Sequence, residues 1–259
     1  FGMGVAGIAL GTLIAEWTST LLAVYLIIQI LLKRHKGDAA FWSWSLISDT
    51  RLLVQTVVAN LNIMIRTLSL LVGFGWFTQQ GARLGDVTLA ANHILVQFIS
   101  FSAFFLDGIV YATEALVGAA AGARKIDVFN NLVRQTTVLA GILALLLSVG
   151  FFVCGAGIVS ALTDLEVVRL AAVSMLPLAC VYILVSFAAF QLDGIYIGVT
   201  RTGDMRNAAL TSLAIYIAAG WPLTNNLGNT GLWLAFIIFI IARATSLAVL
   251  YPRLLRSIS

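Results

Sequence analysis

The chain has 259 residues, of which 61% are hydrophobic and only 10% are charged. Soluble domains are usually about 45–50% apolar and about 25% charged, so this composition excludes a soluble globular enzyme, a disordered tail and a nucleic-acid-binding protein. The net charge of +4 comes from basic residues spread along the chain, and we expect no nucleic-acid partner. The composition is typical of an all-α integral membrane protein surrounded by membrane lipid.

Apolar runs separated by polar clusters predict the membrane-spanning helices. Each needs about 20 mostly apolar residues to cross about 30 Å of hydrocarbon. The last run, 207–251, contains a cluster of Pro, Asn and Gly between Trp221 and Gly231, which divides it in two. The sequence therefore predicts a polytopic protein of about seven transmembrane helices, over residues 4–32, 52–78, 88–121, 132–160, 167–199, 207–223 and 230–251.

The basic residues fall on alternate loops. Eleven of the fifteen Lys and Arg residues, Lys36 among them, lie after the first, third, fifth and seventh segments, whereas only Arg83 and Arg169 lie in the other loops. Cytoplasmic loops carry the excess of Lys and Arg, so the chain is predicted to start outside and to end in the cytoplasm. Arg66 and Arg243 lie within spans, and we expect the side chain of Arg243, close to Pro252, to extend to the interface.

Carboxylates inside spans are the first functional signal, because a charge at mid-bilayer costs about 2.5–3.5 kcal/mol. Polar residues also recur on one helical face of three segments. These faces should turn towards one another, which predicts a shared hydrated cavity. The in-span carboxylates are Glu16, Asp107, Glu114 and Asp193. The candidate ion-coupling and substrate residues are Asp107, Glu114, Asp193, Arg66, Asn62, Tyr182 and Ser186.

Structural alternatives stay open for several of these residues. Arg66 and Asp107 would also suit a buried structural ion pair without any role in coupling. Glu114 and Asp193 lie only about 10 Å of helix from the basic side and would suit an interfacial position. Tyrosines in helices, Tyr182 included, more often pack than line a pathway.

Catalytic motifs are missing from the sequence. It contains neither an HExxH metal motif nor a GxxxxGK[ST] phosphate loop, and neither His35 nor His93 has a Ser or Cys partner at a motif spacing. We therefore expect no enzyme activity, no cofactor and no metal site. Without a nucleotide site the energy source would be an ion gradient, from which one proton releases about 2.3 kcal/mol per 100 mV.

A hexapeptide occurs twice, in segments that cross the bilayer in the same direction. Residues 104–109 read FFLDGI and residues 190–195 read FQLDGI. The surrounding sequences are RTLSLLVGF from Arg66, LDGIVYATEALVGAAAGAR at 106–124 and LDGIYIGVTRTGDMRNA at 192–208. Together they resemble the DinF-like branch of the multidrug and toxic compound extrusion (MATE) transporters.

The resemblance implies a secondary active antiporter of the cell membrane with two six-helix lobes around a central cleft. Such a protein exports small organic, often cationic, compounds in exchange for H⁺ or Na⁺ by alternating access. Residues 1–37 would then be the last helix of the N-terminal lobe and the start of the inter-lobe loop, and residues 38–259 the C-terminal lobe. Because the chain begins at Phe1 within apolar sequence, we expect the rest of the N-terminal lobe, its partner in the same polypeptide, to lie upstream.

By this resemblance Asp107, Glu114 and Asp193 would bind cation and substrate competitively, with Arg66 as their counter-charge. The span 52–78 carries no carboxylate, whereas some other branches of the family have one there, so their cation-site chemistry does not transfer directly. The alternative function is a lipid-linked precursor flippase of the same superfold. It would need a larger cationic cavity, and Arg66 is the one cation expected deep in the membrane.

Overall fold

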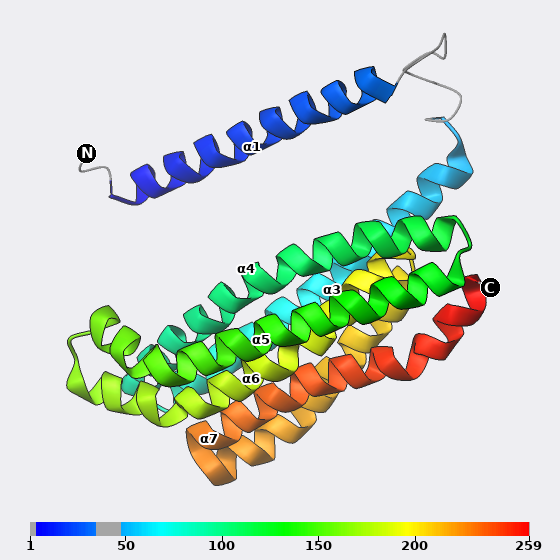
Figure 1. Cartoon of the computed structure of the whole chain (residues 1–259). Helices are drawn as coiled ribbons and strands as arrows, with labels where there is room; N and C mark the ends of the chain where they lie inside the picture. The colour runs from blue at the N-terminus through cyan, green and yellow to red at the C-terminus, as the bar shows by residue number, and fades with distance from the viewer. Residues whose placement is uncertain (1–3, 35–47, 259) are drawn as a thin grey trace. The chain divides into compact units, whose positions relative to one another are not determined.

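The computed structural model describes residues 4–34 and 48–258, and in these ranges the chain is helical without β-strands (Figure 1). All six helices are long and apolar enough to cross a membrane, so the predicted all-α polytopic fold is confirmed. Lys36 and the expected lobe boundary between residues 37 and 38 lie outside the described residues. The helices are α1 (Gly4–Arg34), α3 (Thr50–Arg83), α4 (Asp86–Gly122), α5 (Ile126–Leu162), α6 (Glu166–Gly198) and α7 (Thr202–Ile258).

The chain divides into two compact units, Phe1–Leu53 and Val54–Ser259. The first unit contains α1, with Glu16 on an exposed position of that helix, and the first residues of α3. The second unit contains the rest of α3 and all of α4 to α7. All the candidate site residues therefore belong to the second unit.

Helix α6 is the centre of the second unit and packs against α4, α5 and α7. Glycines allow α4 and α6 to approach closely. A Cβ atom at Gly194 would lie 2.8 Å from Val110 Cγ1, and one at Gly198 would lie 2.6 Å from the carbonyl oxygen of Glu114. Small residues four apart allow this kind of backbone contact between membrane helices. The two helices therefore meet backbone to backbone near their C-terminal ends.

Helix α7 consists of two helical arms joined at Gly228, whose φ of 57° and ψ of −133° suit only glycine. The arms are antiparallel, because the Tyr216 ring stacks on Phe239 with centroids 4.9 Å apart and a Cβ atom at Gly231 would collide with the Leu223 carbonyl oxygen. Figure 1 shows the arms side by side at the orange bend. The predicted division is confirmed, although the first arm continues helically through Pro222 to the bend. Among the described residues, the six candidate spans thus include one, α7, that is folded back on itself as two helical arms.

Two turns end α4 and α6 in the same way. Arg124 (φ 54°) and Thr200 (φ 58°) adopt the left-handed conformation that glycine usually occupies after a helix. The following amides close each turn: Lys125 N–H donates to the Ala120 carbonyl oxygen at 3.1 Å, and Arg201 N–H donates to that of Tyr196 at 2.9 Å. Both turns are Schellman motifs built without glycine, and the β-branched Thr200 is the more strained of the two.

Two buried polar networks hold the helices of this unit together. The Asn92 and Asn229 amides donate to one another at 2.7 and 3.0 Å, and Trp233 Nε1 donates to Asn92 Oδ1 at 2.9 Å. This network joins α4 to the second arm of α7. In the other network Gln191 of α6 bonds to one threonine of α4 and one of α5, so it ties three helices together.

Candidate ion-coupling and substrate site

Asp193 lies on α6 where three helices meet. Its side chain is only 3% exposed, and it forms ion pairs with Arg66 of α3 and with Arg243 of α7. The side chain of Arg66 is 20% exposed and that of Arg243 is 4% exposed. We call these three residues the Asp193 cluster. Segments far apart in the sequence thus bring two cations and one anion together inside membrane-spanning helices.

Pairing between opposite charges allows the cluster to be buried. A buried ion is tolerated only when a counter-ion compensates its lost hydration, and removing one partner of such a pair costs about 3–5 kcal/mol. Two guanidinium groups on a single carboxylate leave the cluster with a net charge of +1. A further negative charge nearby would balance this excess.

Arg243 corrects an expectation from the sequence. Its side chain was predicted to extend to the membrane interface; instead it is buried and paired with Asp193, so that prediction is wrong. The physical reason is the counter-ion: the Asp193 carboxylate of α6 pairs with Arg243 and compensates the cost of burying its charge.

Asp107 supplies the second negative charge. It is half-buried on α4 and interacts electrostatically with both Arg66 and Arg243. Among the described residues Arg66 pairs directly with Asp193 rather than with Asp107. With Asp107 included, two arginines and two aspartates share one region, and the aspartates differ in how far they are exposed.

Asn62 lies four residues before Arg66 on the same face of α3 and is buried. Its Nδ2 donates to Thr202 Oγ1 at 3.3 Å, and its Oδ1 accepts a hydrogen bond from Arg206 Nη1 at 2.9 Å. Both partners belong to the first turns of α7. Asn62 therefore ties α3 to the start of α7, one helical turn from the ion cluster.

Tyr182 and Ser186 are both buried on α6, N-terminal to Asp193. The Tyr182 ring stacks on Phe236 with centroids 4.5 Å apart, and Tyr182 also interacts electrostatically with Arg243. Ser186 Oγ donates to the Ile183 carbonyl oxygen of its own helix at 2.8 Å. In this arrangement Tyr182 packs beside the cluster, and the Ser186 hydroxyl is satisfied within α6.

Glu114 is half-buried on α4, two turns beyond Asp107, and takes no part in the ion pairs of the described residues. It lines a recess of about 450 Å³ between α4 and α6, together with Tyr111, Gly118, Ile197, Gly198 and Thr200. An exposed tyrosine ring and a carboxylate in one recess provide an aromatic face and a negative charge, which are the groups that bind organic cations. This recess is separate from the Asp193 cluster.

Comparison with known proteins assigns the family. A sequence model described as MatE matches residues 77–221, more than half of the chain. The chain belongs to the MatE family. The predicted resemblance is thereby confirmed, and the chain is a multi-pass membrane protein of that family.

Two curated members of the family illustrate the relationship. The MatE chain is 37% identical over 260 residues to DNA damage-inducible protein F of Escherichia coli (strain K12), with 97% of the chain and 54% of that protein aligned. It is 27% identical over 249 residues to Protein DETOXIFICATION 45, chloroplastic, of Arabidopsis thaliana, with 93% and 41% aligned. The chain thus spans about half the length of the curated relatives it matches.

Solved structures show the same fold. The chain superposes with a TM-score of 0.85 on a structure described as the outward-facing conformation of a multidrug resistance MATE family transporter of the MOP superfamily, at 15% identity. The Vibrio cholerae MATE transporter VcmN in its bent form gives a TM-score of 0.83 at 17% identity. Each match covers 99% of this chain and 57% of the other. The second unit therefore has the helix arrangement of a MatE transporter lobe.

Proposed function

We propose that this chain is part of a secondary active efflux transporter of the cell membrane, which exports small organic, often cationic, compounds in exchange for H⁺ or Na⁺. The observation that carries the proposal is the Asp193 cluster. Ionisable side chains within membrane helices are costly and typically belong to substrate or ion pathways. Membership of the MatE family, and the description of a structurally similar protein as a multidrug resistance transporter, support it.

The proposal includes a second lobe. Residues 38–259 would be the C-terminal lobe and residues 1–37 the end of the N-terminal lobe, with the C-terminus cytoplasmic because the basic loops lie on that side. The coverage of 57% of the solved MATE chains is consistent with one lobe plus a helix. A central cleft needs two walls, so this half by itself should transport nothing.

Coupling would arise from competition for the carboxylates. Asp107 is the more exposed aspartate, and it balances the excess positive charge of the Asp193 cluster. When H⁺ or Na⁺ binds to Asp107, that balance is lost, and the remaining positive charge weakens the binding of a cationic substrate in the Glu114 recess, two helical turns further along α4. Release of the ion restores the attraction. Glu114, with the Tyr111 ring beside it in the recess, would hold the substrate cation.

The test is a transport assay with the intact polypeptide in proteoliposomes. Substrate-driven proton release and sodium release are measured for the parent protein and for Asp107→Asn and Asp193→Asn. We expect each variant to lose most of the coupled flux. Asp127→Asn, which changes an exposed carboxylate at the start of α5, is the matched control and should keep it. Normal coupled efflux in both Asp107→Asn and Asp193→Asn would contradict the role given to these carboxylates.

One observation supports the alternative function, a lipid-linked precursor flippase. Such a protein needs several cations deep in the membrane; the sequence predicts only Arg66 there, whereas the structure also buries Arg243. Asp193 and Asp107 together balance both arginines, however, so these offer little free positive charge to a pyrophosphate. The antiporter is therefore the better-supported function. Translocation of a labelled polyprenyl pyrophosphate by the same proteoliposomes, abolished in Arg243→Gln, would reverse this preference.

A further inference from the structure

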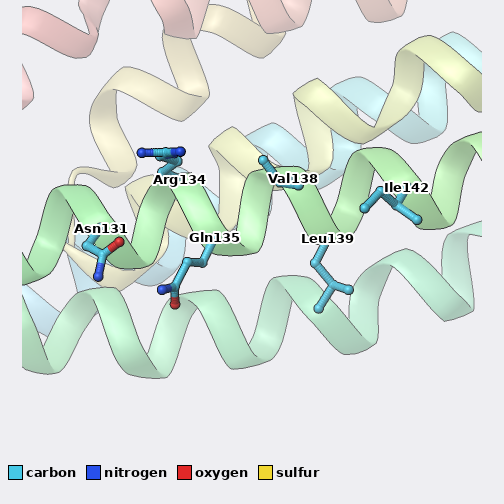
Figure 2. A pocket seen from close by; sticks show the side chains of 6 residues that line it. All are labelled: Asn131, Arg134, Gln135, Val138, Leu139 and Ile142. Carbon is cyan, nitrogen blue, oxygen red and sulfur yellow. The ribbon is translucent and has the colours of Figure 1, made fainter.

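The outer face of α5 carries a groove that the proposed transport site does not use. Six exposed side chains line it, and their recess has a volume of about 560 Å³. All six project from α5 (Figure 2). They form two ridges with a spacing of four residues: Asn131, Gln135 and Leu139 form one, and Arg134, Val138 and Ile142 form the other. Rows of this kind create the natural grooves of a helix surface.

Polarity changes along the groove. Asn131, Arg134 and Gln135 supply amide and guanidinium donors at the end nearer the α4–α5 turn, whereas the other end is aliphatic. Arg134 forms no ion pair within the part of the chain that the structure describes. The groove therefore has a donor-rich end with an uncompensated positive charge and an apolar end.

The depth of this change matches a membrane boundary. Helix α5 has 37 residues, which is about 55 Å of helix. The hydrocarbon core is about 30 Å thick, so a centred α5 extends about 12 Å beyond it at each end. Arg134 lies eight residues from Ile126 at the start of the helix, which is also about 12 Å. With α5 centred in this way, the guanidinium would lie at the level of the lipid headgroups, and Val138 and Ile142 would lie at the level of the acyl chains.

We propose that this groove binds an anionic phospholipid from the leaflet on the side of the α4–α5 turn. The phosphate of the headgroup would accept hydrogen bonds from Arg134 and from the Asn131 and Gln135 amides, since arginine binds phosphate oxygens in a bidentate manner. One acyl chain would lie between the two ridges. Arg124 and Lys125 at the same turn outnumber the single acidic Asp127, so the local field also favours an anion.

The experiment counts bound lipid by native mass spectrometry on the purified protein, titrated with dioleoylphosphatidylglycerol or dioleoylphosphatidylcholine. We expect Arg134→Gln to weaken binding of the anionic lipid about fivefold, the effect of one basic residue near a charged membrane surface. Binding of the zwitterionic lipid should weaken less, because its ammonium group offsets the charge of the phosphate. Lys125→Gln is the matched control, because it removes the same charge from the same end of α5 outside the groove, and it should change binding less than twofold.

A second variant tests the apolar half. Leu139→Trp should fill the groove and lower binding of both lipids while leaving the thermal unfolding transition in place. Equal losses in Arg134→Gln and Lys125→Gln would show that only the general surface charge matters and would overturn the proposal. Unchanged lipid binding in Arg134→Gln would also overturn it, as would variants that alter the oligomeric mass without altering the bound lipid, since the occupant would then be protein.

Discussion

The two copies of the hexapeptide have nearly the same sequence and very different surroundings. In α6, Asp193 and Gly194 are buried, the first between two arginines and the second against the backbone of α4. In α4, Asp107 is half-buried without a direct ion pair among the described residues, and a Cβ atom at Gly108 would meet nothing within 4 Å. Because the copy in α6 lies on faces that other helices cover and the copy in α4 lies on a more exposed face, the neighbours rather than the motif decide what each aspartate does.

The one position at which the two hexapeptides differ also matches the difference in exposure between α4 and α6. Phe105 of α4 is 48% exposed, whereas Gln191 of α6 is 1% exposed. The Gln191 amide donates to Thr136 Oγ1 at 2.6 Å and to Thr113 Oγ1 at 3.2 Å. A buried amide needs these partners, and an exposed position on a membrane helix does not. The copy in α6 is therefore adapted to a protein interior and the copy in α4 to a more exposed helix face.

The largest difference is expected between the aspartates. Asp193→Ala leaves the buried Arg243 and the largely buried Arg66 without their carboxylate and should lower the free energy of unfolding by about 3–5 kcal/mol. Asp107→Ala should lower it by less than about 1 kcal/mol, because that side chain is half-exposed and makes no direct pair among the described residues. Reversible unfolding in mixed micelles of detergent and dodecyl sulfate measures both. Equal losses would mean that the two copies are energetically equivalent.

The next largest difference is expected between the glycines of the two hexapeptides, Gly194 and Gly108. Gly194→Ala places a methyl group 2.8 Å from Val110 Cγ1 and 3.0 Å from the Val110 carbonyl oxygen, which should cost about 1–3 kcal/mol as α4 and α6 are forced apart. Gly108→Ala should be neutral or stabilise by up to about 1 kcal/mol through helix propensity. The same unfolding assay compares them. A loss of stability in Gly108→Ala would reveal a contact on the outer face of α4.

Substitutions at Gln191 and Phe105 test whether each residue is adapted to the exposure of its own helix. Gln191→Leu should cost about 1 kcal/mol, in the range measured for hydrogen bonds between membrane helices. The effect is modest because Thr113 and Thr136 each keep a bond to a carbonyl oxygen of their own helix. Phe105→Leu should change the free energy of unfolding by a few tenths of a kcal/mol at most. If the two substitutions have the same effect, the three-helix network does not contribute to stability.

The smallest effect is expected at the turns that end the two helices. Thr200→Gly should raise the free energy of unfolding by about 0.5–1 kcal/mol, because it relieves the left-handed strain of a β-branched residue. Arg124→Gly relieves less, since the arginine side chain is unbranched at Cβ. Thermal unfolding of the two variants, measured in the same detergent, gives the comparison. The opposite order would show that Thr200 is held by contacts of its own.

Much of this fold is readable from the sequence because hydropathy, charge and turn chemistry act locally. The apolar runs define the helices, and the cluster that contains Gly228 marks the bend in α7. Burial of polar faces also explains why Asp193 and Arg66, on segments far apart in the chain, come together. These features depend on composition and helical period alone, so one sequence is enough to predict them.

What the sequence does not contain is the register between helices and their exact ends. The partnership of Arg243 depends on which level of α6 faces the second arm of α7. The Asn92–Asn229 pair depends on which level of α4 faces the bend of α7. The close contact at Gly194 and Gly198 was not predicted, although their spacing of four residues was visible. A pattern of small residues becomes informative once the facing helix is known.

The position of Asn62 has a mechanical consequence. It lies one turn from Arg66 on the same side of α3, and its amide forms hydrogen bonds with Thr202 and Arg206 in the first turns of α7. A rotation of α3 about its own axis that withdrew Arg66 from Asp193 would therefore also pull Asn62 away from both partners. The ion pair of Arg66 and the hydrogen bonds of Asn62 are therefore coupled, because a rotation that breaks one also strains the other. Any working motion that frees Arg66 would then carry the beginning of α7 with it, so that the ion site and the α6–α7 turn move as one part.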